Sequence, residues 1–356
     1  MLAWRIRSFN RAVYQNSKGP RRSWVVSSYH ALMAFYLVTG GAGFIGSHIT
    51  TALLGRGDRV RILDNLSSGT VDNFIGTEIG ELGSGAPIEL LVGDIKDASA
   101  CKKACDGVHG VFHEAAQVSV PRSVEAPEES YAVNVTGTLN VLEGARAGGA
   151  KQVVFAASSA AYGESESLPK IETMHTDPVS PYASGKVAAE QLMKVWGRCY
   201  GLKTVCLRYF NVFGPRQVDD SPYTGVIALF VRALLEGRAP RIYGDGEQTR
   251  DMTYIDNVVE INLRAMSADL AAGTVINVGG GQRITINQLY GAIAEGLGSN
   301  LKPEYVPERP GDVKHSLASV EKAKVLLDWA PGTDWRAGLA QTLVWYRERF
   351  EAAGKK

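Results

Sequence analysis

The stretch Thr39-Gly40-Gly41-Ala42-Gly43-Phe44-Ile45-Gly46 decides the fold of this chain of 356 residues. It follows a short apolar run and precedes an amphipathic segment, a pattern that predicts a strand, a glycine turn and a helix. Gly40 permits a tight turn, Gly43 lets a pyrophosphate approach the backbone, and Gly46 lets the helix pack closely on the strand. The N–H groups at the helix N-terminus, near Phe44 and Ile45, can then bind phosphate oxygens.

Asp64, at the end of the next predicted strand, extends this pattern, and Asn65 follows it. A carboxylate at this place can accept hydrogen bonds from the ribose hydroxyls of an adenosine. An NADP site would favour a cation here to meet the 2′-phosphate, and neither residue supplies one. A glycine loop alone is a weak signal, but strand, loop, helix and acidic residue in this order predict an NAD site.

Two later segments are expected to complete that site. Asp94 and Ile95 follow the third strand, where Asp94 can hydrogen-bond the adenine amino group. Ala115 and Ala116 follow the fourth strand, and their small side chains would leave room for the cofactor to cross the sheet. Either segment alone is typical of an ordinary loop.

Short β-branched runs alternate with longer amphipathic stretches, which predicts an α/β Rossmann fold with a doubly wound parallel sheet. After Gly214-Pro215, short helices lie among loops with Pro and Gly, which favours a smaller C-terminal substrate-binding lobe. We expect the NAD-binding domain to span 33–211 with returning segments near 254–280, and the lobe to span mainly 212–350. The predicted strands are 35–39, 59–63, 88–92, 109–113, 152–157 and 203–208, and the predicted helices are 44–56, 98–106, 127–148, 180–200, 225–237, 285–297 and 319–328.

The first 32 residues differ from the rest, because they are basic and contain no Asp or Glu. Met33 stands just before the first predicted strand, so we expect the fold to begin there. Residues 1–32 would then be an upstream extension or a misassigned start. An organelle transit peptide and an accessory arm stay open as alternatives.

The bulk composition argues against several partners. A formal net charge of +1 gives no electrostatic case for nucleic acid or an anionic membrane. No apolar run approaches the roughly 20 residues of a membrane helix, and a content of four cysteines favours a reducing cytoplasm. Cys101 and Cys105 lie one helical turn apart, but no His or second Cys pair stands near them, so we expect no metal site.

Tyr182 and Lys186 stand at positions i and i+4 of a predicted helix, so their side chains share one face. Alone, such a pair is usually a solvated helix surface. An earlier strand ends in Ser158-Ser159, where a hydroxyl can hydrogen-bond the same substrate hydroxyl that Tyr182 deprotonates. Lys186 beside a cationic nicotinamide would lower the pKa of Tyr182, which could then act as a base near neutral pH.

Together these motifs resemble the extended short-chain dehydrogenase/reductase family over residues 35 to about 348. Within that family, the later motifs are similar to those of the UDP-hexose 4-epimerases, especially those that accept UDP-N-acetylglucosamine. These motifs are Arg208-Tyr209-Phe210-Asn211-Val212-Phe213-Gly214-Pro215-Arg216, Tyr243-Gly244-Asp245-Gly246, Thr249-Arg250-Asp251 and Arg309-Pro310-Gly311-Asp312-Val313.

The resemblance implies that Tyr182 takes the proton of the sugar 4-hydroxyl while carbon 4 gives a hydride to NAD. The 4-keto sugar then turns over and receives the hydride on its other face. Ser158 matches the family's catalytic hydroxyl, and Ser159 is a second candidate. Related dehydratases and decarboxylases carry acids where this chain has Ser159 and Ala160, so those reactions are disfavoured. Another nucleotide-sugar activity, such as uronate epimerisation, stays open, as does a non-catalytic NAD-sensing scaffold.

The resemblance also implies a UDP-sugar site. The two arginines among its residues suit a diphosphate, because the guanidinium is permanently charged and forked. A bulky tyrosine at the position of Ser316 narrows the pocket in the family, so the serine suggests that N-acetylated sugars fit alongside plain hexoses. The helices 127–148 and 180–200 resemble those of a four-helix homodimer interface, an expectation by analogy. The implied substrate residues are Ser119, Arg122, Asn211, Tyr243, Arg250, Arg309, Asp312 and Ser316.

Overall fold

The computed structural model describes residues 33–217, 225–308 and 314–354. The expectations for residues 1–32, Arg309 and Asp312 therefore lie outside the described residues. Residues 1–32 and residues 33–356 separate into two units, and only the second is described below.

An eight-stranded sheet forms the centre of this unit. All its neighbouring strands run parallel, in the order β12-β7-β6-β5-β1-β2-β4-β3. The order reverses between β1 and β5, the kind of switch point where open α/β sheets bind ligands. The predicted doubly wound fold is thus confirmed. The strands are β1 Phe35–Thr39, β2 Arg59–Asp64, β3 Ile79–Glu81, β4 Ile88–Val92, β5 Gly110–His113, β6 Gln152–Ser158, β7 Lys203–Tyr209 and β12 Thr274–Val278.

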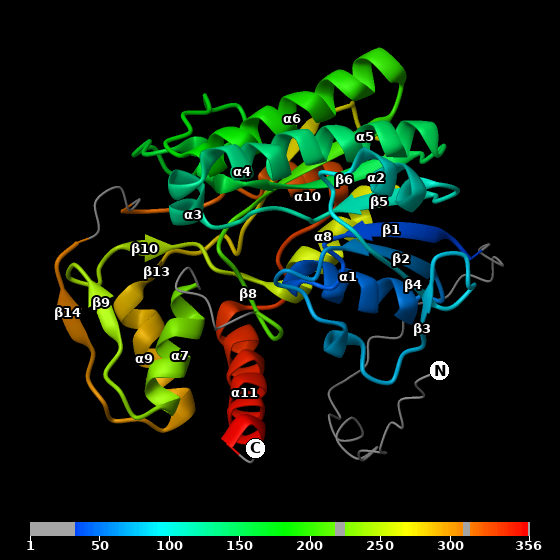
Figure 1. The fold of residues 1–356 in the computed structure, drawn as a ribbon. Helices are drawn as coiled ribbons and strands as arrows, with labels where there is room; N and C mark the ends of the chain where they lie inside the picture. Colours follow the sequence, from blue (N-terminus) through cyan, green and yellow to red (C-terminus); the bar gives the residue numbers. More distant parts are fainter. Residues whose placement is uncertain (1–32, 218–224, 309–313, 355–356) are drawn as a thin grey trace. The chain divides into compact units, whose positions relative to one another are not determined.

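Helices cover both faces of the sheet (Figure 1). The helices α2, α5 and α6 lie on one face, and α1 and α8 lie on the other. Successive residues of β1 therefore pack into different apolar clusters, Leu37 toward the first set of helices and Val38 toward the second. Burial on both faces is why this strand is a continuous apolar run. The helices are α1 Phe44–Gly55, α2 Ala98–Cys105, α5 Thr138–Ala147, α6 Pro181–Tyr200 and α8 Ile255–Ser267.

A smaller lobe lies beside the sheet, on the left in Figure 1. Its segments alternate in sequence with segments of the sheet layer, because α8 packs against the sheet and β12 pairs with β7. The lobe contains the parallel pair β9–β14 and the antiparallel pair β10–β13. Its elements are α7 Val226–Leu235, α9 Ile286–Leu297, β9 Arg241–Tyr243, β10 Thr249–Arg250, β13 Ile284–Thr285 and β14 Glu304–Val306.

The predicted single helix 127–148 is interrupted. The helix α4 (Pro127–Tyr131) leads into a π-helical stretch, η2 (Ala132–Gly137), and only then into α5. Apolar periodicity does not reveal the extra residue per turn of a π-helix, a geometry that is frequent at functional sites.

Further elements fall outside the predicted set. They are η1 Val71–Phe74, α3 Val120–Glu125, η3 Ser159–Tyr162, β8 Val212–Phe213, β11 Thr253–Tyr254 and α11 Trp335–Gly354, together with β3, β9, β10, β13 and β14. The predicted helix 319–328 is the shorter α10 (Glu321–Leu327). Most of these elements are too short to produce a recognisable period in the sequence.

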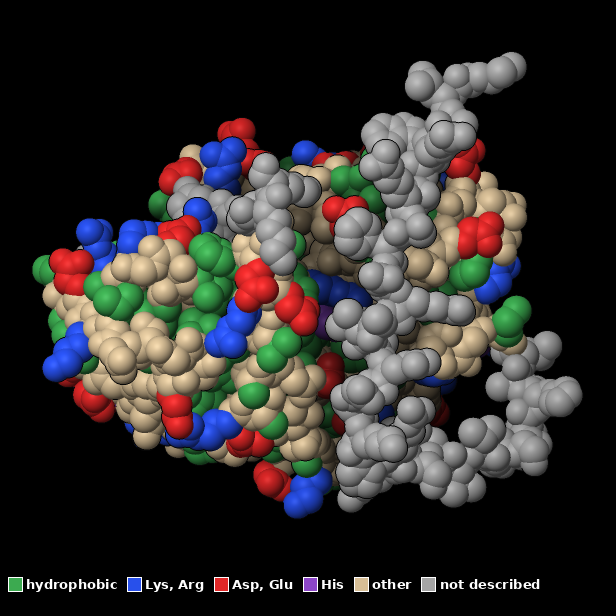
Figure 2. Space-filling model, turned by 90° about the horizontal axis from the view of Figure 1, so that it is seen from below, with side chains coloured by type: hydrophobic (Ala, Val, Ile, Leu, Met, Phe, Trp, Pro, Cys, Tyr) green, Lys and Arg blue, Asp and Glu red, His purple; other side chains and the backbone are tan. Residues whose placement is uncertain are grey.

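The surface carries charges of both signs. On the face seen in Figure 2, acidic and basic side chains of the described residues are interspersed among apolar and neutral ones. This mixture agrees with the formal net charge of +1. In the described segments, every helix is too short or too polar to cross a membrane.

A buried ion pair holds α6 on the sheet. Glu190 of α6 accepts two hydrogen bonds from Arg208 of β7, Nε to Oε1 at 2.8 Å and Nη2 to Oε2 at 2.7 Å. Both side chains are almost fully buried. Such a pair fixes the position of α6, and with it the predicted catalytic residues one and two turns earlier on the same helix.

Replacing Glu190 should therefore destabilise the protein. The change Glu190→Leu leaves the Arg208 guanidinium buried without its carboxylate, and we expect it to cost about 3–5 kcal/mol of unfolding free energy. The exposed pair of Lys203 with Asp269, at the start of the same strand, is the matched control. Lys203→Met should cost less than about 1 kcal/mol. If urea unfolding showed equal losses of unfolding free energy in Glu190→Leu and Lys203→Met, the stabilising role assigned to the buried pair would be contradicted.

Candidate functional site

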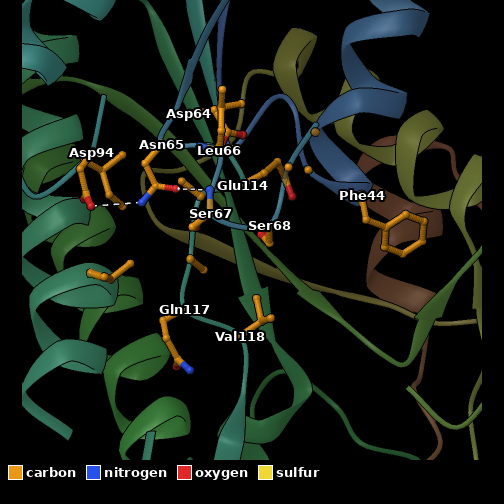
Figure 3. A pocket seen from close by; sticks show the side chains of 18 of the residues that line it. Phe44, Asp64, Asn65, Leu66, Ser67, Ser68, Asp94, Glu114, Gln117 and Val118 are labelled. Carbon is orange, nitrogen blue, oxygen red and sulfur yellow. Dashed lines mark hydrogen bonds between the residues drawn. The ribbon is translucent and has the colours of Figure 1, made fainter. Parts of the chain in front are cut away.

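A cleft of about 760 Å³ opens at the carboxyl ends of β1, β2, β4 and β5 (Figure 3). Its size lies in the usual range for cofactor sites. Eleven of the predicted cofactor residues line this one cleft, although they come from four separate segments. They are Gly40, Gly43, Phe44, Ile45, Gly46, Asp64, Asn65, Asp94, Ile95, Ala115 and Ala116.

The glycine loop is shaped by contacts that exclude side chains. Gly40 has a φ of +65°, which favours glycine. A Cβ on Gly46 would lie 2.2 Å from the Gly40 carbonyl oxygen, closer than any real contact. A Cβ on Gly43 would meet only that same oxygen, at 3.2 Å, so this side of the loop faces the cleft openly. The loop thus leaves room for a group that approaches its backbone.

Asp64 holds this loop in place. Its Oδ2 accepts a hydrogen bond from the Ala42 N–H at 3.0 Å, and its Oδ1 accepts one from the Leu66 N–H at 2.8 Å. Asn65 turns toward the next strand end, where its Nδ2 donates to Asp94 Oδ2 at 3.1 Å (Figure 3). The acidic residue predicted to select NAD therefore also ties β2 to the glycine loop.

Tyr182 and Lys186 lie one turn apart on α6 and are not among the residues that line the cleft. The side chain of Ser158, the last residue of β6, lies near enough to the Tyr182 phenol to act on its pKa. Lys186 is buried, and its Nζ donates to the carbonyl oxygen of Ala156 at 2.7 Å. Of the two candidate serines, Ser158 is the one that acts on the pKa of the tyrosine, while Ser159 begins the short helix η3.

The protonation of these two groups is set mainly by burial. Burial raises the pKa of Tyr182, and the side chain of Ser158 opposes that rise. Burial lowers the pKa of Lys186 to about 8, while the nearby carboxylates of Glu114 and Glu190 raise it. The groups of the chain itself therefore raise the pKa of Tyr182, and the lowering expected beside a cationic nicotinamide stays a prediction.

Two predicted substrate residues come together at the lobe. Asn211, which has a φ of +31°, donates from Nδ2 to the Asp251 carbonyl oxygen at 3.0 Å and to Ser316 Oγ at 3.4 Å. The same Ser316 hydroxyl accepts the Asp251 N–H at 3.2 Å. A small side chain at position 316 is thus built into the junction between β8 and β10.

The remaining predicted substrate residues are more dispersed. Arg250 donates from Nη1 to the carbonyl oxygen of Thr249 at 3.0 Å, and Tyr243 ends β9 in the same lobe. Ser119 lines the cleft and caps α3. Arg122 forms an exposed ion pair with Glu129, at 2.9 Å.

Sequence reasoning missed Asn134, which lies in the π-helical stretch η2. Its Oδ1 accepts the Gln117 N–H, and its Nδ2 donates to the Gln117 carbonyl oxygen, both at 3.0 Å. The two bonds satisfy the backbone N–H and C=O of Gln117, as a neighbouring strand would, in the segment that follows β5 and lines the cleft. The available signal for this role was the position of a polar residue, Asn134, within an apolar helical pattern.

The close approach of Gly46 to Gly40 gives a direct test of the loop. Gly46→Ala should displace the loop and weaken NAD binding by more than about tenfold. It should also lower the unfolding free energy by about 1 kcal/mol or more, which corresponds to a fall of several degrees in the melting temperature. Gly55→Ala is the matched control, since Gly55 ends the same helix and its Cβ would meet nothing within 4 Å. If Gly46→Ala and Gly55→Ala bound NAD with equal affinity in calorimetry, the close approach of Gly46 to Gly40 would not be needed for NAD binding.

Comparisons with known proteins agree with this geometry. The model of the NAD dependent epimerase/dehydratase family matches residues 36–279. A UDP-glucose 4-epimerase of Mycolicibacterium smegmatis is 38% identical over 317 residues, which are 88% of this chain and 99% of that protein.

Two solved structures are similar along most of the chain. A UDP-N-acetylglucosamine 4-epimerase from Methanobrevibacter ruminantium in complex with UDP-N-acetylmuramic acid has a TM-score of 0.83 and 39% identity, covering 89% of this chain and 99% of its own. A UDP-glucose 4-epimerase with UDP-glucose from Thermotoga maritima has a TM-score of 0.82 and 38% identity, covering 88% and 99%. The chain therefore belongs to the NAD dependent epimerase/dehydratase family, whose cofactor is NAD.

Proposed function

We propose that this protein is a 4-epimerase of UDP-hexoses, with UDP-N-acetylglucosamine and UDP-N-acetylgalactosamine as its main substrates. The observation that carries the proposal is the placement of Ser158 beside the Tyr182 phenol, with Lys186 one turn further along α6. Relatives named UDP-sugar 4-epimerases support the same activity.

The cleft fits the cofactor of the family. The open side of Gly43 leaves room for a pyrophosphate against the backbone, and the N–H groups at the start of α1 can bind its oxygens. Asp64 lines the same cleft, where its carboxylate can meet ribose hydroxyls. Bound NAD would take a hydride from carbon 4 of the sugar and return it.

Tyr182 would move the proton of the same reaction. Its phenolate takes the proton of the sugar 4-hydroxyl while carbon 4 loses its hydride, and it gives the proton back when the hydride returns to the other face. Ser158 holds the reacting hydroxyl. The buried ammonium of Lys186 stabilises the phenolate, because charges of opposite sign interact strongly where water is excluded.

The residues after β6 favour epimerisation over elimination. Ser159 and Ala160 occupy the first turn of η3, directly after Ser158. Removal of water from carbons 5 and 6 needs an acid and a base near that place, and neither a hydroxymethyl nor a methyl group can serve. The 4-keto sugar would therefore be reduced back to a hexose rather than lose water.

Ser316 supports the choice of N-acetylated sugars. Its hydroxyl lies between Asn211 and Asp251, so a small side chain stands where the resemblance places the wall of the sugar pocket. A larger residue here would take up space that a 2-acetamido group needs. Plain UDP-hexoses would also fit the wider pocket.

We also propose that the protein is a homodimer through α5 and α6. Val195 and Tyr200 of α6 are exposed apolar side chains on the outer helical layer. Burial of such residues against a second copy would form the expected bundle of four helices.

Replacing the tyrosine tests the mechanism. Tyr182→Phe removes the base but keeps the ring, so turnover of UDP-N-acetylglucosamine should fall by about 10²–10⁴-fold while NAD binding persists. Tyr131→Phe is the matched control, because the Tyr131 hydroxyl donates to Ser184 at the surface. Product analysis after incubation with each UDP-sugar is the measurement. Unchanged turnover in Tyr182→Phe would rule out this base.

Replacing the serine tests the substrate. Ser316→Tyr should abolish turnover of the N-acetylated UDP-sugars and spare UDP-glucose and UDP-galactose, because it narrows the pocket. Ser316→Ala keeps the small volume and should retain all four activities, which separates size from hydrogen bonding. A wild-type protein that turned over only plain hexoses, or only a UDP-uronate, would overturn the proposed substrate.

A further inference from the structure

Glu114 is a half-buried acid whose charge acts on Lys186. It directly follows β5 and lines the cofactor cleft (Figure 3). Its Oε1 accepts a hydrogen bond from the Tyr209 hydroxyl at 3.1 Å. Its Oε2 is closed off from solvent and has no hydrogen-bond partner among the described residues. A buried carboxylate oxygen without a partner is costly and calls for a cation or a donor.

The hydrogen bond joins Glu114, which follows β5, to Tyr209, the last residue of β7, and β6 lies between these two strands in the sheet. Ala156 of β6 belongs to the same apolar cluster as Tyr209. The carbonyl oxygen of the same Ala156 accepts the hydrogen bond from Lys186 Nζ. Glu114 lies near enough to Lys186 for its charge to raise the pKa of the lysine.

Two carboxylates act on the charge of Lys186, and one of them is already neutralised. Glu190 gives both of its oxygens to the Arg208 guanidinium. Glu114 has only a neutral phenol and an unused oxygen. Within the described part of the chain, Glu114 is thus the carboxylate left to balance Lys186.

We propose that Glu114 is a positioning residue that supplies the counter-charge for Lys186 and for the positively charged nicotinamide. This inference rests on the proposed function, in which the sugar loses a hydride to the ring and a proton to Tyr182. Before that step the ring and Lys186 are cationic, and Tyr182 and Glu114 are anionic. After it the ring and Tyr182 are neutral, so the four groups sum to zero in both states.

The protonation of the pair agrees with this role. Burial raises the pKa of Glu114 to about 7, while the Tyr209 hydrogen bond and Lys186 lower it. Burial lowers the pKa of Lys186 to about 8. Each charge therefore favours the other, because Lys186 lowers the pKa of Glu114 and Glu114 raises the pKa of Lys186.

The test compares the affinities of oxidised and reduced cofactor. The oxidised ring is cationic and the reduced ring is neutral, so loss of the Glu114 charge should weaken NAD⁺ binding more than NADH binding. We expect Glu114→Gln to raise the ratio of the two dissociation constants about tenfold at pH 7.5, measured by calorimetry and NADH fluorescence. The glutamine keeps the shape and can still accept the Tyr209 hydrogen bond.

Two further variants separate charge from shape. Glu114→Asp keeps the charge but shortens the side chain, so the ratio should stay within about twofold of wild type. Glu295→Gln removes one acid from the exposed face of α9 and should likewise leave the ratio unchanged. If Glu114→Gln does not fold, Glu114→Met fills a similar volume without charge and should show the same tenfold rise.

A ratio that stays within twofold of wild type in a folded, uncharged variant overturns the inference. An equal shift in Glu114→Asp would also overturn it, because a purely structural role would then explain the effect. No sugar takes part in these measurements. Their outcome is therefore independent of whether the Tyr182→Phe and UDP-sugar assays support the proposed reaction.

Discussion

The contact between Gly46 and the Gly40 carbonyl oxygen is the constraint on which the cofactor half of the molecule depends. Helix α1 can start directly over the end of β1 only because no side chain stands between them. That start brings the first N–H groups of the helix to the cleft. Asp64 then fixes the same loop from the neighbouring strand through the backbone N–H of Ala42. Packing and ligand recognition thus use the same few atoms.

Much of the fold could be predicted from the sequence, because strands buried on both faces appear as continuous apolar runs. The strands from β1 to β7 that carry the cleft fall within one or two residues of their predicted ranges, apart from the short β3. The strands of the lobe could not be predicted, since strands of two or three residues are too short to produce an alternating apolar pattern. The π-helical stretch at Asn134 was also missed, because its extra residue per turn leaves the apolar pattern almost unchanged.

The site followed a similar division. Residues at strand ends, such as Asp64 and Ser158, could be predicted because their position relative to a strand fixes which edge they reach. The charged and hydrogen-bonding partners inside the site could not be predicted. Glu114 is hydrogen-bonded to Tyr209, which ends a strand two places away in the sheet. Such a contact between strands distant in sequence has no local signal.

The alternation of segments between sheet and lobe has a consequence for how this protein can be divided. β12 and α8 come from beyond residue 250, yet one pairs with β7 and the other covers a face of the sheet. A chain cut after residue 211 would leave β7 as an open edge above uncovered apolar side chains, a surface prone to aggregation. The sheet layer is therefore completed only when the chain beyond residue 250 has been made, so its folding requires both halves of the sequence.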